Sequence, residues 1–274
     1  ESCSQFDSLP LTSLTIVDLI KRSAAPFLLA ELLGGEPEYY RTQITTGQLA
    51  LRFPGDLCAP GSAAMSPGGF ENVRKYWHID GCPSGFIPGV TDHYGEVHNF
   101  TALVGCLLSD VPEPMSGELC VYPGSAEALA AHFAREGKLE ELQRVGDSAL
   151  PHAETDALFA RPVKHCIGKA GTLFIANYMT AHFIAPNTAA DIRYAVYFRV
   201  KSPSFHGGRH DDGTRPESML KPWLDWKGLD GSAAAGGAAA PGALRRQPTR
   251  EEAGAQRARD LHLATANYDH TQRT

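Results

Sequence analysis

The spacing of hydrophobic residues changes near residue 48. Between residues 12 and 35 apolar positions recur every three or four residues, which predicts N-terminal helices that Gly34 and Gly35 close. From Leu49 the apolar residues alternate with polar ones until Pro54-Gly55, which predicts a strand followed by a turn. The chain is therefore expected to begin with helices and to continue as a β-rich domain.

Short apolar or β-branched runs separated by turn residues follow this first strand. Two helical patterns, from Ser125 to Gly137 and from Leu139 to Gly146, interrupt them, with Ser125 expected as a helix cap. The expected strands are Tyr76 to Asp80, Phe100 to Leu108, Leu119 to Tyr122, Val163 to Ile167, Thr172 to Ala176, Ala181 to Ala185 and Arg193 to Val200. Closely spaced strands without alternating helices favour an antiparallel sandwich or barrel, so the fold class is mainly β with flanking helices.

Composition changes sharply towards the C-terminus. Residues 231–243 are Gly, Ala, Ser and one Pro, which is typical of a flexible linker, and 244–274 form a charged tail with few large apolar residues. We therefore expect one domain over 1–230, with its core at 49–200. Nothing in the sequence indicates the oligomeric state.

Charge and composition exclude several classes of protein. The net charge of −6 disfavours nucleic acid as a partner, and the longest apolar stretch, Ala24 to Leu33, is too short to span a membrane. The cysteines show no metal-binding or disulfide spacing, so we expect reduced thiols and an intracellular, cytoplasmic location. A targeting segment upstream of Glu1 would not be visible. The cysteines are Cys3, Cys58, Cys82, Cys106, Cys120 and Cys166.

His78-Ile79-Asp80 is the first candidate for chemistry. Alternation along a strand would place the imidazole and the carboxylate on one face, where both could reach one metal ion. A His hydrogen-bonded to a nearby Asp in a purely structural role is the alternative for this triplet taken alone.

A second group of polar residues supplies what the triplet lacks. His182 offers a third ligand, and Arg193 follows eleven residues later, in the next expected strand. Two imidazoles and one carboxylate leave three positions open on Fe(II), enough for a bidentate cosubstrate and O₂. A guanidinium nearby suits a carboxylate group on that cosubstrate better than a lysine would.

These residues resemble the phytanoyl-CoA dioxygenase-like family of Fe(II)- and 2-oxoglutarate-dependent oxygenases. The resemblance runs from about Leu49 to Val200. It rests on His78-Ile79-Asp80-Gly81, on the segment from Gly117 to Ser125, on His182 with Pro186-Asn187, and on Arg193.

The resemblance implies a double-stranded β-helix, or jelly-roll, core. It also implies that His78, Asp80 and His182 bind Fe(II) and act as the catalytic centre, that Arg193 binds 2-oxoglutarate, and that O₂ is consumed. The expected reaction is hydroxylation of a small-molecule substrate, with release of succinate and CO₂. Related halogenases replace the carboxylate, so Asp80 favours hydroxylation.

Two alternatives stay open. Many relatives have His where this chain has Ala126, so the chain could be a non-catalytic jelly-roll protein that binds a metal or ligand. An iron oxidase that takes all its electrons from substrate is disfavoured by Arg193. The substrate itself is not readable from the sequence.

Several weaker candidates have structural interpretations that we prefer. A solvated loop accounts for the polar cluster after the last core strand, and packing accounts for the C-terminal tryptophans. His93 and His98 are the candidate substrate contacts, and Asn72, Lys75 and Thr101 are the candidate cosubstrate contacts. The polar loop contains His206, Arg209, His210, Asp211 and Asp212, and the tryptophans are Trp223 and Trp226.

Overall fold

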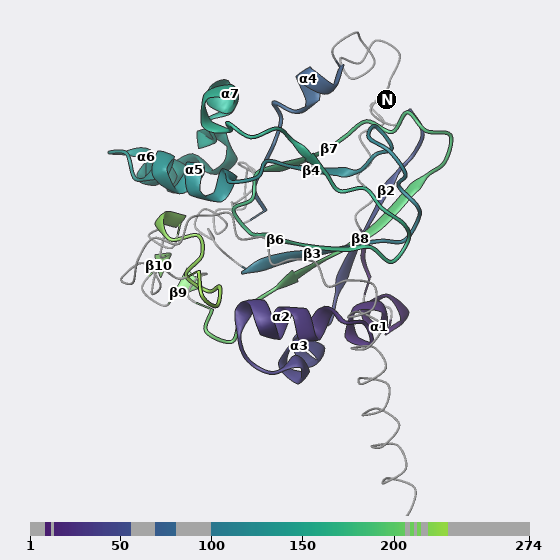
Figure 1. The fold of residues 1–274 in the computed structure, drawn as a ribbon. Helices are drawn as coiled ribbons and strands as arrows, with labels where there is room; N and C mark the ends of the chain where they lie inside the picture. Colours follow the sequence, from purple (N-terminus) through teal and green to yellow (C-terminus); the bar gives the residue numbers. More distant parts are fainter. Residues whose placement is uncertain are drawn as a thin grey trace, which may run out of the picture. The chain divides into compact units, whose positions relative to one another are not determined.

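Two antiparallel β-sheets with helices at their flanks form the described part of the chain (Figure 1). The computed structural model describes residues 9–11, 14–55, 69–80, 100–205, 209–210, 213–214 and 219–229. All of them belong to one unit, Glu1–Ala233. The expected linker and tail lie outside the described residues, as do His93, His98, His206, Asp211 and Asp212.

The larger sheet has five strands and the smaller has three. In spatial order the larger contains β1 (Leu9–Leu11), β2 (Gly47–Arg52), β8 (Arg193–Val200), β3 (Ala102–Leu107) and β6 (Leu173–Asn177). The smaller contains β5 (Lys164–His165), β4 (Leu119–Val121) and β7 (His182–Ile184). Two strands of two residues each, β9 (Arg209–His210) and β10 (Gly213–Thr214), form a separate sheet.

Helices form one group before β2 and another between β4 and β5, and α4 stands alone between β2 and β3. The described helices are α1 (Leu14–Lys21), α2 (Ala25–Leu33), α3 (Pro37–Gln43), α4 (Gly69–Val73), α5 (Ser125–Phe133), α6 (Lys138–Val145) and α7 (Thr155–Leu158), with 3₁₀ turns η2 (Gly146–Ala149) and η3 (His152–Glu154). In this part of the chain no helix has the length and apolar character needed to cross a bilayer.

The first three helices cover one face of the larger sheet. Ile20 of α1 and Leu29 of α2 are fully buried against Val196 and Phe198 of β8. Figure 1 shows these helices gathered under β3 and β8. The N-terminal helices and the cap at Gly34 were correctly predicted, whereas α3 was not.

A second core fills the space between the two sheets. Leu103 of β3 and Ala195 of β8 belong to the same buried cluster as Leu119 of β4 and Phe183 of β7. Strand alternation explains both cores, since successive side chains of β8 point to opposite faces. Odd-numbered residues from 193 to 199 therefore face the smaller sheet, while even-numbered ones face the helices.

Two local predictions were wrong. Residues 76–80 form no strand; they make only an isolated β-bridge between His78 and His182. Ser125 does not cap α5 either. Gly124 precedes the helix with φ of 82° and no side-chain cap, and Ser125 Oγ instead accepts a hydrogen bond from the Ala181 backbone N–H at 2.8 Å. This contact ties α5 to the start of β7.

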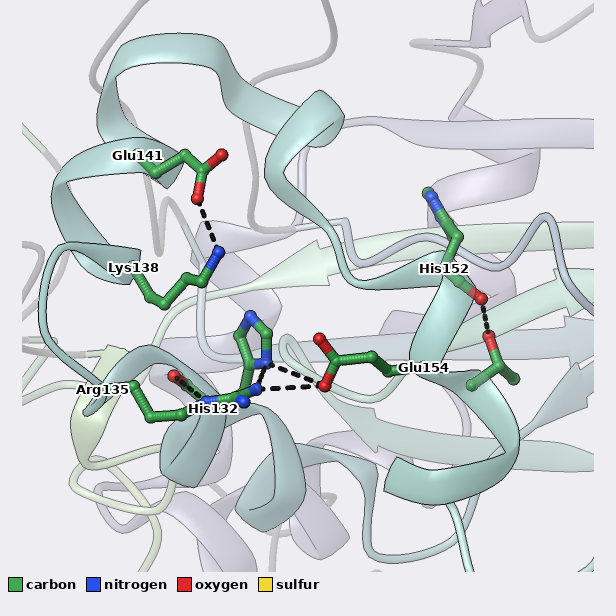
Figure 2. A network of polar contacts seen from close by, with 7 residues as sticks. His132, Arg135, Lys138, Glu141, His152 and Glu154 are labelled. Atoms are coloured by element: carbon green, nitrogen blue, oxygen red, sulfur yellow. Dashed lines mark hydrogen bonds and ion pairs between the residues drawn. The ribbon is translucent and has the colours of Figure 1, made fainter.

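A polar network joins α5 to the η3 turn. Figure 2 shows His132 and Arg135 of the α5 region beside Glu154, with the Arg135 Nη2 to Glu154 Oε2 distance at 3.2 Å. Arg135 Nη2 also contacts His132 Nδ1 directly. Ionic contacts as well as packing therefore hold the α5 region against the η3 turn.

Candidate metal centre and its cavity

The three predicted ligands converge, although His182 lies far along the chain from His78 and Asp80. Candidate ligand atoms of His78, Asp80 and His182 all lie within 4.8 Å of one another. Asp80 Oδ1 lies 3.7 Å from His78 Nε2 and 3.6 Å from His182 Nε2. One ion between these three atoms would be bound by two imidazoles and a carboxylate.

Backbone pairing places the two histidines side by side. The His78 N–H donates to the His182 carbonyl at 2.9 Å, and the His182 N–H donates to the His78 carbonyl at 3.0 Å. Their ring centroids are 4.4 Å apart. His182 Nδ1 lies 2.8 Å from the Thr180 carbonyl, which can only accept, so Nδ1 carries the proton and the Nε2 lone pair is available to a metal.

Asp80 is oriented by a cation on its other side. Arg199 Nη2 donates to Asp80 Oδ2 at 2.9 Å, and this leaves Oδ1 facing the two imidazoles. Burial by itself would raise the pKa of Asp80, but His182, whose Nε2 lies 3.6 Å from Oδ1, and the guanidinium of Arg199 together hold that pKa well below its usual range. The carboxylate is therefore ionised at neutral pH.

His78 lies at the open side of the cluster, where 46% of its side chain remains exposed. Partial burial of the ring, and then the adjacent His182, lower the pKa of His78 to about 4. The imidazole is thus neutral at physiological pH, which is the protonation state a metal ligand requires.

The cluster lies on the wall of a cavity of about 80 Å³ between the two sheets. Three arginines and one carboxylate are the charged side chains of its lining, so the cavity favours an anionic ligand. The lining residues are Gln48, Ala50, Arg52, His78, Asp80, Leu103, Leu119, His182, Ile184, Arg193, Tyr197 and Arg199.

Arg193 lies on the same cavity wall and is only 2% exposed. Its Nε donates to the Gly117 carbonyl at 2.6 Å, and its Nη1 donates to the Ala50 carbonyl at 3.1 Å. Its Nη2 is buried and has no hydrogen-bond partner among the described residues. An unsatisfied buried donor on a cationic group costs free energy, which a carboxylate ligand would offset.

Gly117 makes this geometry possible. It has φ of 74°, and a Cβ at this position would lie 2.8 Å from Arg52 Cβ. Neighbouring Asn187, from the predicted Pro-Asn motif, donates from Nδ2 to the Arg52 carbonyl at 2.8 Å and to the Asp191 carbonyl at 2.8 Å. The motif therefore holds the loop before β8 against the end of β2.

Sequence reasoning missed the four other polar or charged residues of the cavity lining: Gln48, Arg52, Tyr197 and Arg199. The signal was present in the alternation of β2 and β8. Gln48 pairs with Tyr197, and Arg52 pairs with Arg193, all on the cavity face. Extending the alternation from Arg193 would have reached Arg199.

The weaker candidates whose side chains the structure describes do not line this cavity. Thr101 is buried, and its Oγ1 accepts the Ser202 N–H at 3.0 Å, so it is a structural residue. Trp223 and Trp226 pack edge to face at 5.3 Å, as expected for packing residues. Lys75 is exposed, and the side chains of Asn72, Arg209 and His210 are outside the described part. Ala126 is buried in the core between the sheets.

A scan against protein-family models and a search of curated proteins found no match to the chain. Solved structures do show similarity. AviO1 from Streptomyces viridochromogenes Tue57 is 15% identical, with a TM-score of 0.33, over 60% of this chain and 53% of that chain. EvdO2 from Micromonospora carbonacea var. aurantiaca, complexed with 2-oxoglutarate, is 12% identical, with a TM-score of 0.39, over 77% and 73%.

A third example is iron-bound HygX from Streptomyces hygroscopicus, which is 13% identical, with a TM-score of 0.36, over 79% of this chain and 85% of that chain. The chain spans about half the length of AviO1 and 27% of EvdMO1.

Proposed function

We propose that the protein is an Fe(II)- and 2-oxoglutarate-dependent dioxygenase that hydroxylates a small molecule and releases succinate and CO₂. The observation that carries this proposal is one cavity that holds both the His78, Asp80 and His182 cluster and the buried Arg193. A metal ligand set and an unsatisfied cation at one cavity match the two ends of a keto-acid cosubstrate.

The donor set fits Fe(II) in number and chemistry. Two imidazole nitrogens and one carboxylate oxygen from the protein leave open positions on the ion, as non-haem iron oxygenases require. His182 is supported by Thr180, and Asp80 by Arg199, so two of the three ligands already have the outer hydrogen bonds that orient metal ligands.

The other end of the cavity fits a carboxylate. Arg193 Nη2 is the buried donor that needs an acceptor, and its Nε and Nη1 are held by two backbone carbonyls. The guanidinium is therefore preorganised before a ligand arrives. Arg52 and Arg199 add to the local positive potential, which attracts a dianion into a protein whose net charge is −6.

Iron with 2-oxoglutarate and O₂ supplies, when bound, the oxidising power to break an unactivated C–H bond. The chain's own residues would do the rest. Arg193 orients the cosubstrate, Arg199 keeps Asp80 Oδ1 turned towards the histidines, and Leu119 and Ile184 restrict water at the cavity wall.

Three finer assignments belong to the same proposal. The two sheets are proposed to form a jelly-roll core, and the chain is proposed to be phytanoyl-CoA dioxygenase-like. The catalytic domain is proposed to span 1–230, with a linker at 231–243 and a tail at 244–274. The motif order from His78 to Arg193 supports the family, and the antiparallel strand order supports the core.

Succinate release tests the proposal directly. Protein supplied with Fe(II), 2-oxoglutarate and O₂ should form succinate, and a panel of small molecules that stimulates this release would identify the substrate. His78→Ala and Asp80→Ala should reduce turnover to background, whereas Asp110→Ala, a surface acid paired with Lys169, should not. A folded, metal-loaded protein that fails to bind 2-oxoglutarate would instead support a non-catalytic binding protein.

A further inference from the structure

The smaller sheet carries a second set of metal-binding side chains on its opposite face. Strand alternation through β4 places Leu119 towards the cavity, as its position in the lining shows, and directs Glu118 and Cys120 to the other side. His165 of β5 is the register partner of Cys120. Glu118, Cys120 and His165 therefore meet on a face that the proposed oxygenase chemistry does not use.

Their ligand atoms are close together. His165 Nδ1 lies 2.6 Å from Glu118 Oε1 and 3.4 Å from Cys120 Sγ, and Cys120 Sγ lies 3.7 Å from Glu118 Oε1. Glu118 is 0% exposed, and backbone N–H groups of Met115 and Ser116 donate to its two oxygens at 3.0 and 2.9 Å. A carboxylate fixed at this depth is costly without a cation nearby.

We propose that Glu118, Cys120 and His165 form a second metal site, selective for Zn²⁺ or another divalent ion that accepts thiolate. A tetrahedral Zn²⁺ with S, N and O ligands separates its ligand atoms by about 3.4 to 3.6 Å. The two distances from Cys120 Sγ, 3.4 and 3.7 Å, already match this geometry. Only the 2.6 Å contact between His165 and Glu118 has to open, by about 0.8 Å, as a hydrogen bond is exchanged for a metal bond.

Charge balance favours an ion at this depth. One carboxylate and one thiolate neutralise a divalent cation, so the loaded site carries no net charge in the sheet interior. Burial and the Glu118 carboxylate raise the pKa of the Cys120 thiol, so the metal-free site holds a neutral thiol. Binding would release that thiol proton to solvent, and the His165 proton would move from Nδ1 to Nε2.

His165 is the ligand of this cluster that borders a pocket. His165 lines a pocket of about 480 Å³, and Phe70 of α4 stacks on its ring with centroids 5.3 Å apart. Arg74, which lines the same pocket, is already paired with Glu71 and Asp156. Glu118 and Cys120 are buried and do not line this pocket, so an ion would enter the site past the His165 ring.

Cobalt and zinc loading test this site separately from the first. A His78→Ala/Asp80→Ala double variant removes two ligands of the other cluster, so the second site can be measured alone. After chelation and dialysis against Zn²⁺, it should retain about one ion per chain. Loaded with Co²⁺, it should show thiolate-to-metal charge-transfer absorption and the visible bands of a tetrahedral ion.

Variants in the double-variant background complete the test. Cys120→Ser should abolish the charge-transfer band and zinc retention, and His165→Gln should abolish zinc retention. Cys106→Ser, which alters a buried thiol of β3, should change neither. Circular dichroism checks folding. Zinc retention near zero in the folded double variant, or a thiolate band that survives Cys120→Ser, would overturn the proposal. Because succinate release is not measured, failure of the oxygenase proposal would leave this result unaffected.

Discussion

Arg199 and Asp80 form a charge-assisted hydrogen bond between adjacent layers of the fold, with Nη2 2.9 Å from Oδ2. Asp80 follows the irregular segment that carries His78, whereas Arg199 lies in β8 of the larger sheet. Arg199 Nη1 also donates to Gln48 Oε1 at 2.8 Å, which fixes the guanidinium on β2. The sheet thereby determines which carboxylate oxygen faces the histidines.

Arg199→Ala should weaken metal binding without unfolding the protein. Without the Arg199 hydrogen bond, Asp80 would lose its fixed orientation. A hydrogen bond from a neighbouring residue to a metal ligand typically contributes about 10- to 100-fold to metal affinity. Calorimetric titration with Mn²⁺, under conditions where the second cluster is blocked by Cys120→Ser, measures the effect. Arg41→Ala, which removes a half-buried arginine of α3 paired with Glu38, is the matched control. Equal affinities for both variants would show that Arg199 does not orient Asp80.

Arg193→Lys should weaken 2-oxoglutarate binding while leaving metal affinity close to that of the unmodified protein. Lysine keeps the charge but loses the planar fork, so one charge-assisted hydrogen bond worth about 1.5–3 kcal/mol is lost, which corresponds to about a 10- to 100-fold increase in Kd. Anaerobic titration of the Mn²⁺-loaded protein with 2-oxoglutarate gives both quantities. Arg22→Lys, at an exposed position directly after α1, should bind normally. Unchanged cosubstrate binding in Arg193→Lys would place the anchor elsewhere.

Residue type and order were enough to identify the candidate ligands, because few side chains bind metals and two of them were separated by a single residue. The alternation of β8 was equally readable, since Arg193 is followed by buried apolar residues on the opposite face. What the sequence could not supply was the irregular backbone at 76–80. The aromatic and β-branched residues there favour a strand, but the structure pairs only His78 with a neighbour.

The reason lies in a tertiary contact that no local pattern contains. Trp77 Nε1 donates to Thr155 Oγ1 at 2.7 Å, and Thr155 Oγ1 donates to the His152 carbonyl at 2.6 Å. His152 Nε2 in turn donates to the Trp77 carbonyl at 2.7 Å. These three hydrogen bonds close a ring that holds Trp77 against η3 and α7, so the segment before His78 pairs with this helical region and not along a strand.

Thr155→Val should lower metal affinity as well as stability. The substitution leaves the buried Trp77 Nε1 without its acceptor, which costs about 1–3 kcal/mol, and it loosens the backbone that carries His78. Thr101→Val is the matched control, because it removes another buried hydroxyl that accepts a backbone N–H far from this ring. Both variants should unfold at lower urea concentration, but only Thr155→Val should bind Mn²⁺ more weakly. Parallel losses of affinity would mean that the ring has no specific effect on the site.

Acidification should destabilise the α5 region through His132, which Figure 2 shows beside Arg135 and Glu154. Burial, and then the charge of Arg135, lower the pKa of His132 in the folded protein. Below its ordinary pKa of about 6.5, the unfolded chain binds a proton that the folded chain resists, so the free energy of unfolding falls as pH decreases. Above that pH both states are neutral and this contribution vanishes.

Urea unfolding of the metal-free protein at pH 7.5 and 5.5 measures this difference. His132→Gln should reduce the loss of stability between the two pH values, because the glutamine does not titrate. Glu154→Gln should increase it, since Glu154 raises the His132 pKa and partly offsets burial. Because the two variants change the pH dependence of stability in opposite directions, they distinguish titration of His132 from a general effect of acid on the fold. If Glu154→Gln reduced the pH dependence as His132→Gln does, the titrating group would be Glu154 itself or another partner in the network.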